Sequence, residues 1–218
     1  MLKKNKWILI ITTLALLLPM ILGLLLWNRL PESVPTHWGI DGQPDGWSSK
    51  AVVVFLFPAI MLAFHWVCIL VSMADPKRAN YSQKTFQLVL WICPMLSLLI
   101  NSLSYAAALG KAIRVEILMP ILMGILFVVI GNLLPKMKQS YTMGIKLPWT
   151  LNNEENWNKT HRLGGWVWVI GGIVMIATAF LGQFWLLLGL VVLMCLIPTV
   201  YSYCLHRKQQ TDSKGEDV

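Results

Sequence analysis

The most constraining feature of this sequence is a series of long uncharged hydrophobic runs separated by short polar segments. The first extends from Trp7 to Trp27, and a later stretch from Leu163 to Leu205 contains no charged residue. A helix rises about 1.5 Å per residue, so roughly 20 residues cross the hydrocarbon core of a bilayer. The later stretch is therefore long enough to cross twice. Only 13% of the chain is charged, about half the usual share in soluble domains. These runs predict a membrane protein.

The pattern predicts an all-α integral membrane protein with a single domain over residues 1–218, a six-transmembrane-helix bundle. Pro19 is expected to kink the first span, and Gly182-Gln183 is expected to turn the chain between the last two. The polar tail 206–218 is expected to be disordered. The predicted spans are residues 7–27, 51–74, 86–109, 115–134, 164–182 and 184–205.

The basic residues predict the orientation of these spans. Fourteen Lys and Arg residues fall before the first span, in 75–84, in 135–162 and in the tail, and four fall in the other connections. The positive-inside rule then places both termini in the cytoplasm. The net charge of +8 is thus explained by membrane topology, and we expect no direct binding of nucleic acid.

Chemistry-bearing residues are sparse. The four cysteines lack metal-ligand or disulfide spacing, so we expect no metal site and no cofactor. No HExxH or Gly-x-Ser-x-Gly motif is present, and we expect that the chain is not an enzyme. A small-solute or ion transporter, using His65, Asn101 or Glu116, remains an alternative. A hydrolase with His37 and Asp45 as a base pair is a weaker one.

The connection 28–50 is predicted to be an outer loop with a motif of its own. It reads LPESVPTHWGIDGQPDGW from Leu30 to Trp47, rich in proline and glycine turn signals, so it should be compact and non-helical. Its tryptophans suit the headgroup level of a membrane. Either they only anchor the loop, or the loop is a receptor surface. The candidate toxin-binding residues are His37, Trp38, Asp45 and Trp47.

The connection 135–163 is predicted to carry an inner loop motif. A short helix is expected over 150–158, with Thr150 or Asn152 as N-cap and Glu154 in its first turn. It either connects two spans along the membrane surface or docks a cytoplasmic partner. Thr150, Glu154 and Lys159 are expected to tolerate substitution. The candidate cytoplasmic-motif residues are Asn132, Pro135, Gly144, Pro148, Trp149 and Trp157.

Together the two loops resemble the SdpI family of bacterial immunity proteins and its N-terminal module of unknown function. The outer pattern is Leu30-Pro31, Val34-Pro35-Thr36-His37-Trp38, Gly42 and Asp45-Gly46-Trp47. The inner pattern is Gly131-Asn132, Pro135-Lys136, Gly144-Ile145-Lys146, Pro148-Trp149-Thr150-Leu151, Trp157 and Arg162. Lys146 stands where the family often has Arg, and Ser140 where it often has Asn.

The resemblance implies a function that composition does not. Best-known family members protect a producing bacterium from its own secreted, membrane-active peptide toxin. Some also act as receptors that hold a small DNA-binding autorepressor at the membrane. The expected partners are therefore membrane lipid, a secreted peptide toxin and a cytoplasmic DNA-binding autorepressor.

Overall fold

The computed structural model describes residues 2–216 and divides into two compact units. The first comprises Met1–Ala74 and Gln83–Val115, and the second Asp75–Ser82 and Glu116–Val218. Six helices are long and apolar enough to cross a membrane, as the sequence predicted. They are Leu2–Leu25, Val52–Ala74, Gln83–Ala108, Val115–Lys136, Glu154–Leu181 and Phe184–Asp212.

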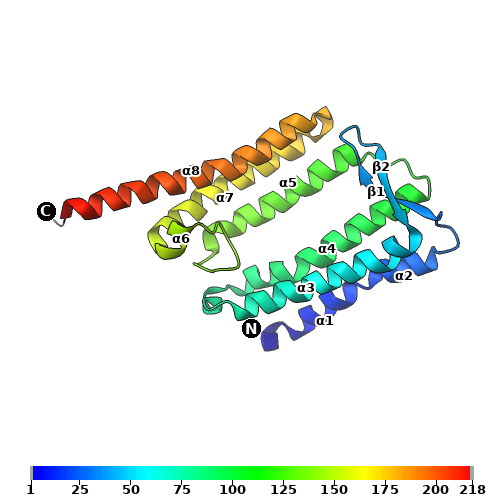
Figure 1. The fold of residues 1–218 in the computed structure, drawn as a ribbon, viewed down its shortest axis with the longest axis horizontal. Coiled ribbons are helices and arrows are strands. Elements are labelled where there is room, and N and C mark those ends of the chain that lie inside the picture. The colour runs from blue at the N-terminus through cyan, green and yellow to red at the C-terminus, as the bar shows by residue number, and fades with distance from the viewer. Residues whose placement is uncertain (1, 217–218) are drawn as a thin grey trace. The chain divides into compact units, whose positions relative to one another are not determined.

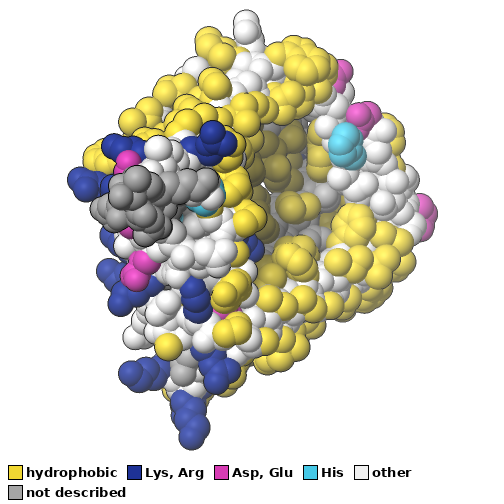
Figure 2. Space-filling view, turned by 60° about the vertical axis from the view of Figure 1, so that its left-hand side comes forward, with side chains coloured by type: hydrophobic (Ala, Val, Ile, Leu, Met, Phe, Trp, Pro, Cys, Tyr) yellow, Lys and Arg dark blue, Asp and Glu magenta, His cyan; other side chains and the backbone are white. Residues whose placement is uncertain are grey.

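Large apolar side chains remain exposed along these helices (Figure 2), which suits a surface solvated by lipid tails. Trp7 is 67% exposed and Trp185 73% exposed. An apolar surface of this extent would be a liability in water. The all-α membrane class predicted from the sequence is confirmed.

In the first unit, two short helices precede a β-hairpin, and two long helices complete the unit, the first of which has a π-helical start (Figure 1). The elements are α1 (Lys6–Ala15), α2 (Leu18–Leu25), β1 (Ser33–Trp38), β2 (Pro44–Ser49), η2 (Val52–Leu56), α3 (Phe57–Ala74) and α4 (Gln83–Ala108).

Pro19 divides the first span rather than only bending it. Helix α1 ends at Ala15, and Pro19 lies in the first turn of α2, where a missing N–H removes no helical hydrogen bond. The Tyr105 hydroxyl of α4 donates to the Pro19 carbonyl at 3.0 Å and is buried. A Cβ at Gly23 would lie 2.7 Å from the Tyr105 oxygen, so glycine permits this close packing. The predicted kink is confirmed as a helix break.

The loop 28–50 contains an antiparallel hairpin, which the sequence reading did not predict. Strand β1 pairs with β2 from Ser33 opposite Ser49 to Trp38 opposite Pro44, with irregularities around His37. The loop is compact and non-helical, as expected. A small core of buried side chains fixes its base, formed by Leu30, Val34, Val53, Val54 and Tyr105.

In the second unit, three long helices follow a short segment from the connection between α3 and α4. The long helices are α5 (Val115–Leu133), α7 (Glu154–Thr178) and α8 (Phe184–Glu216). The short helix α6 (Pro148–Asn152) precedes α7, and there are 3₁₀ turns η3 (Arg78–Asn80), η4 (Leu134–Lys136) and η5 (Ala179–Leu181). Gly182, at φ 62°, makes the predicted turn before α8.

Two details of this unit differ from the sequence prediction. There is no separate helix over 150–158, because α6 ends at Asn152 and α7 starts at Glu154 and continues as the fifth span. The N-cap is Asn153, whose side chain accepts the Asn156 N–H at 2.8 Å, and not Thr150 or Asn152. Glu154 and Glu155 do lie in the first turn, where the helix dipole favours them.

The last helix extends into the segment that was predicted to be a disordered tail. Helix α8 continues through residues 206–216, whereas a disordered segment was expected, and residues 217–218 lie outside the described part of the chain. Once a long helix exists, each added residue gains a hydrogen bond without a new nucleation cost. Arg207, Lys208 and Gln209 are also good helix formers, which favours this extension.

Glycines let α5 and α7 approach backbone to backbone. A Cβ at Gly172 of α7 would lie 2.5 Å from the Gly124 carbonyl oxygen of α5, and one at Gly131 would lie 2.9 Å from the Gly165 carbonyl oxygen. The two contacts are seven residues apart on each helix. Small residues at such a seam give close van der Waals contact where lipid provides no hydrophobic driving force.

Candidate functional site

The hairpin places two of its candidate residues in direct contact. His37 Nδ1 lies 2.5 Å from Asp45 Oδ1, and both side chains are mostly exposed. Gly46 allows this approach, since a Cβ there would lie 2.9 Å from His37 Cβ. The pair bridges β1 and β2 across the irregular register at His37. Its geometry stabilises the hairpin and presents a polar, hydrogen-bonding surface.

The two candidate tryptophans of the hairpin differ in exposure. Trp47 is 55% exposed and lies two residues after Asp45 on β2, so the two side chains are on the same exposed side. Trp38 is half-buried. Ile40, in the turn, is 63% exposed. The structure therefore groups His37, Asp45 and Trp47 on one accessible face. A large exposed aromatic beside a polar pair is a common feature of protein-binding surfaces.

Lys50 fastens the base of the hairpin, a role that sequence reasoning missed. It is 8% exposed, and its Nζ lies 2.8 Å from Glu32 Oε1 and 3.4 Å from the Trp27 carbonyl oxygen. The ammonium also lies 4.7 Å from the centre of the Trp27 ring, within cation–π range. From the sequence Lys50 counted only as one of the few basic residues on its side of the membrane.

In the second unit, Asp75 organises the polar loops at the end of the helices. Its Oδ2 accepts hydrogen bonds from the Tyr81 hydroxyl at 2.5 Å, the Ser140 hydroxyl at 3.1 Å and the Tyr141 N–H at 3.0 Å. Thr142 donates both its N–H and its hydroxyl at 3.1 Å. Asp75 is 3% exposed. One carboxylate thus ties segment 75–82 to segment 140–142.

The titration of this network follows from its contacts. Burial alone would raise the pKa of Asp75, but hydrogen bonds from Tyr81, the Lys77 N–H, Ser140 and Thr142 outweigh burial and lower it. Burial and the hydrogen bond to Asp75 raise the pKa of Tyr81. At neutral pH, Asp75 is therefore charged and Tyr81 is a donor, and each stabilises the other.

Trp157 and His161 of α7 form a buried centre, and the loop 137–147 packs against it. Trp157 is wholly buried and donates from Nε1 to the Met137 carbonyl at 2.8 Å, and its ring stacks on His161 at 4.0 Å between centroids. His161 Nε2 accepts the Ile145 N–H at 2.9 Å, and Nδ1 lies 2.8 Å from the Trp157 carbonyl. These partners require a neutral ring protonated at Nδ1. Gly144, at φ 106°, leaves room for that ring.

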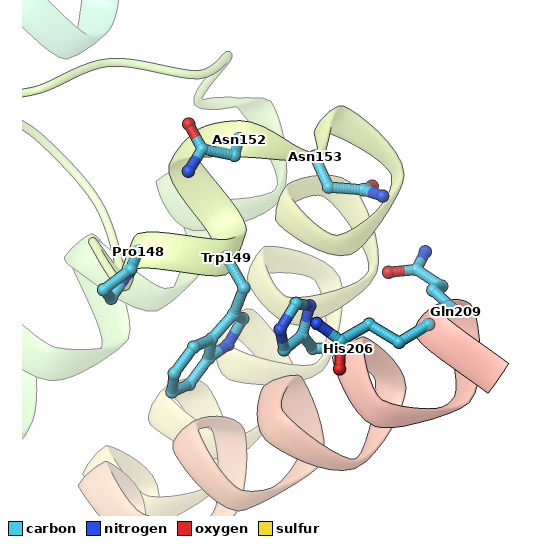
Figure 3. A pocket seen from close by; sticks show the side chains of 7 residues that line it. Pro148, Trp149, Asn152, Asn153, His206 and Gln209 are labelled. Carbon is cyan, nitrogen blue, oxygen red and sulfur yellow. The ribbon is translucent and has the colours of Figure 1, made fainter. Parts of the chain in front are cut away.

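Trp149 lines a pocket beside the last helix, shown in Figure 3 with Pro148, Asn152, Asn153, His206 and Gln209. Gln210 also lines it, and its volume is about 470 Å³. The Trp149 ring stacks on His206, with centroids 5.5 Å apart and planes 13° apart. Its Nε1 donates to the Ser202 hydroxyl at 2.7 Å. The pocket offers an aromatic wall and several amide groups.

The candidate residues of the cytoplasmic motif therefore do not form one site. Gly144 and Trp157 are part of the buried centre, and Pro148 and Trp149 line the pocket. Asn132 is exposed and accepts from Lys136 Nζ at 3.3 Å. Pro135 lies against Gly165, whose Cβ would be 2.6 Å from Pro135 Cγ. The motif mainly specifies how this end of the unit packs.

Thr150 was expected to tolerate substitution, but its side chain is buried and hydrogen-bonded. It is wholly buried; its hydroxyl donates to the Ile145 carbonyl and accepts the Leu147 N–H, both at 2.9 Å. Asn156 is buried as well and bonds Ser202 of α8 through both amide atoms, at 3.0 and 2.8 Å. Glu154 and Lys159 are exposed, as expected. Their local sequence gave no signal that separates these cases.

Two polar residues that the sequence singled out within the spans are buried. His65 and Asn101 are buried, and Asn101 donates to the Ser97 carbonyl at 2.8 Å. Within residues 2–216, neither ring nitrogen of His65 has a hydrogen-bond partner. No group of three His, Cys, Asp or Glu side chains among the described residues could hold a metal ion.

Comparison with known proteins agrees with the family resemblance. Residues 136–202 match the SdpI/YfhL protein family, and residues 14–62 match a domain of unknown function, DUF1648. The chain is similar to the SdpI family in both of these regions. The first match covers α6 with Trp149, all of α7 with Trp157 and more than half of α8, and the second covers the hairpin.

A relative extends this similarity over most of the chain. The immunity protein SdpI of Bacillus subtilis (strain 168) is 25% identical over 213 residues, which cover 94% of this chain and 97% of that protein. No solved structure matches the chain. With six apolar helices, the relationship makes this a multi-pass bacterial membrane protein.

Proposed function

We propose that this protein confers immunity to a secreted, membrane-active peptide, and that the hairpin 33–49 recognises that peptide. The observation that carries the proposal is the exposed face formed by His37, Asp45 and Trp47 on a hairpin whose base is anchored in the protein. Peptides that disrupt bilayers lie at the interface through one apolar face. A rigid hairpin beside the membrane meets such a peptide where it acts.

The charge of the hairpin favours a cationic peptide. Residues 33–49 contain Asp41 and Asp45 and no Lys or Arg. Both aspartates are exposed, next to the exposed apolar side chains of Ile40 and Trp47. Apolar contact area with acidic residues around it complements an amphipathic peptide that carries Lys or Arg.

The orientation required by this proposal is the one that the basic residues predict. The hairpin must face the outside, and segments 75–84 and 135–162 must face the cytoplasm. The fourteen Lys and Arg residues on one side against four on the other support it. A reporter enzyme that is active only outside the cytoplasm should be active when fused after Asp41 and inactive when fused after Asn80.

The proposal is tested by deleting the gene from its own bacterium. The deletion strain should stop growing or lyse in cell-free spent medium of its parent, and a plasmid copy of the gene should restore growth. Protease treatment of the medium should remove the effect, because the agent is a peptide. Equal growth of the deletion strain and the parent in untreated medium would exclude immunity to a peptide that the bacterium secretes.

A second role, docking of a cytoplasmic DNA-binding autorepressor, is supported by the pocket beside Trp149. Asn152 is exposed and lines that pocket, so Asn152→Arg should block it without disturbing the hairpin. In the same assay this variant should still restore growth but fail to raise transcription from its own promoter when spent medium is added. Unchanged induction would remove the pocket from the signalling role.

The transporter and hydrolase alternatives have less support. The His37–Asp45 pair is exposed, and a general base of this kind normally works in a site shielded from water. His65, buried in α3 and well inside an apolar helix, is a residue that a transport pathway could use. If the gene improved the growth of the deletion strain in medium without any peptide, these alternatives would be favoured.

A further inference from the structure

A second pocket in the second unit is lined almost entirely by apolar atoms. Its volume is about 330 Å³, near the lower end of small-molecule sites. It lies between the end of α5, the loop 137–145 and one side of α8. The lining residues are Ile130, Leu134, Met137, Gly144, Ile145, Trp168, Cys195, Pro198 and Thr199.

The few polar groups in this lining are already used by the protein. Trp168 donates its Nε1–H to the Met194 carbonyl at 3.1 Å, and the Thr199 hydroxyl donates to the Cys195 carbonyl at 2.8 Å. Pro198 has no N–H to offer. An occupant would therefore meet hydrocarbon surface with little hydrogen bonding, which suits an aliphatic chain better than a polar solute.

Three lysines that are sequence neighbours of lining residues form what we call the basic rim of this pocket. Lys136 and Lys138 flank Met137 in the chain, and Lys146 follows Ile145, so three exposed lysines adjoin lining residues. Lys136 donates to the Asn132 amide oxygen and Lys146 to the Thr142 carbonyl, each at 3.3 Å, and both acceptors are neutral. Their positive charge therefore remains available to an anion.

The position of the rim along the helices matches a lipid headgroup. The fourth apolar helix ends at Lys136, so the lysines stand where a span leaves the hydrocarbon layer. Trp168 and Cys195 lie farther along α7 and α8, inside their apolar stretches. Charge at the headgroup level and an apolar pocket next to it together complement an anionic amphiphile.

We propose that this pocket binds an anionic phospholipid, with one acyl chain in the pocket and the phosphate at Lys136, Lys138 and Lys146. The lipid comes from the leaflet that meets this end of the unit. It would fill the space between α5 and α8 and hold the loop 137–147 against the helices. This site is independent of the hairpin and of the proposed immunity.

The test is lipid competition on the full-length protein purified in detergent. An equimolar mixture of phosphatidylglycerol and phosphatidylcholine is added, and the bound lipid is measured by native mass spectrometry. Each lysine near an anionic partner contributes about fivefold at low salt. We expect at least a tenfold preference for phosphatidylglycerol, falling to about twofold or less when all three lysines are replaced by glutamine. An unchanged preference in that variant would overturn the headgroup site.

A second variant tests the acyl-chain part of the proposal. Thr199→Phe places a ring in the pocket and should reduce the binding of both lipids, whereas Val200→Phe, at the next and 55% exposed position, should not. Equal lipid binding by these two variants would exclude the pocket. Competition by inorganic phosphate alone, at the concentration of the lipid, would show a simple anion site and would also overturn the proposal.

Discussion

Replacing Asp75 with alanine is expected to lower the thermal midpoint of the purified protein by roughly 10 °C. Asp75 is buried and accepts hydrogen bonds from Tyr81, Ser140 and the segment 141–142. Hydrogen bonds to a charged group contribute about 1.5–3 kcal/mol each, and they are not additive, so we estimate a loss of about 4 kcal/mol. For a chain of this size, 1 kcal/mol corresponds to roughly 2–4 °C.

Two further variants give the expected order of effects for Asp75. Asp75→Asn keeps an oxygen that accepts from Tyr81 but loses the charge and the acceptor for the Lys77 N–H. Its thermal midpoint should therefore lie between those of wild type and Asp75→Ala. Asp212→Ala, at an exposed carboxylate of α8, should leave the midpoint unchanged. Unfolding is followed by tryptophan fluorescence in detergent. Equal midpoints for Asp75→Ala and Asp212→Ala would show that Asp75 does not organise the loops.

The pH dependence of this stability follows from the lowered pKa of Asp75. A carboxyl group with a lowered folded-state pKa stabilises the protein at pH values above its ordinary pKa of 3.8. That contribution is lost as pH falls through the lowered pKa. The difference between wild type and Asp75→Ala should therefore be full at pH 7 and shrink below about pH 4. The raised pKa of Tyr81 adds stability that is lost only as pH rises above 10.0.

Adding a single methyl group at Gly172 is expected to be nearly as disruptive. In Gly172→Ala the new Cβ would lie 2.5 Å from the Gly124 carbonyl oxygen and 3.0 Å from the Val128 backbone nitrogen. Both are backbone atoms and cannot rotate away, so α5 must move from α7 along the seam. Overpacking in a tight interface costs about 1–3 kcal/mol or more. We expect a fall in the midpoint of roughly 5 °C or more.

Gly189→Ala is the matched control for that variant. Gly189 lies in α8, and a Cβ there would meet no atom within 4 Å. Alanine is the better helix former by about 0.8–1 kcal/mol, so this variant should be neutral or slightly stabilised. If Gly172→Ala unfolds at the same temperature as Gly189→Ala, the close backbone contact between α5 and α7 is absent.

The sequence predicted the spans well because hydropathy at helical length is a local property. The break at Pro19 and the turn at Gly182 also have local causes, a missing N–H and a left-handed backbone. The hairpin was missed because Pro35, Pro44 and the glycines read as an irregular loop. Its strands are stabilised by packing against residues far along the chain, such as Tyr105.

The polar network of the second unit was beyond sequence reasoning for the same reason. Asp75 was read only as part of a basic connection, and its partners Ser140 and Thr142 are 65 and 67 positions away. Thr150 looked like a tolerant surface residue, although its hydroxyl bonds the backbone on two sides. For the hairpin, the sequence did identify His37, Asp45 and Trp47, but only the structure separates exposed Trp47 from half-buried Trp38.

The central claim is that the exposed face of the hairpin recognises the peptide, and Trp47 tests it most directly. The deletion strain is complemented with Trp47→Ala or with Trp185→Ala, a control at a 73% exposed tryptophan of α8, and survival in parental spent medium is counted at equal membrane abundance. An aromatic anchor of an interface is worth about 2 kcal/mol or more, so Trp47→Ala should reduce survival roughly tenfold or more. Trp185→Ala should protect like wild type. Full protection by Trp47→Ala would contradict the account.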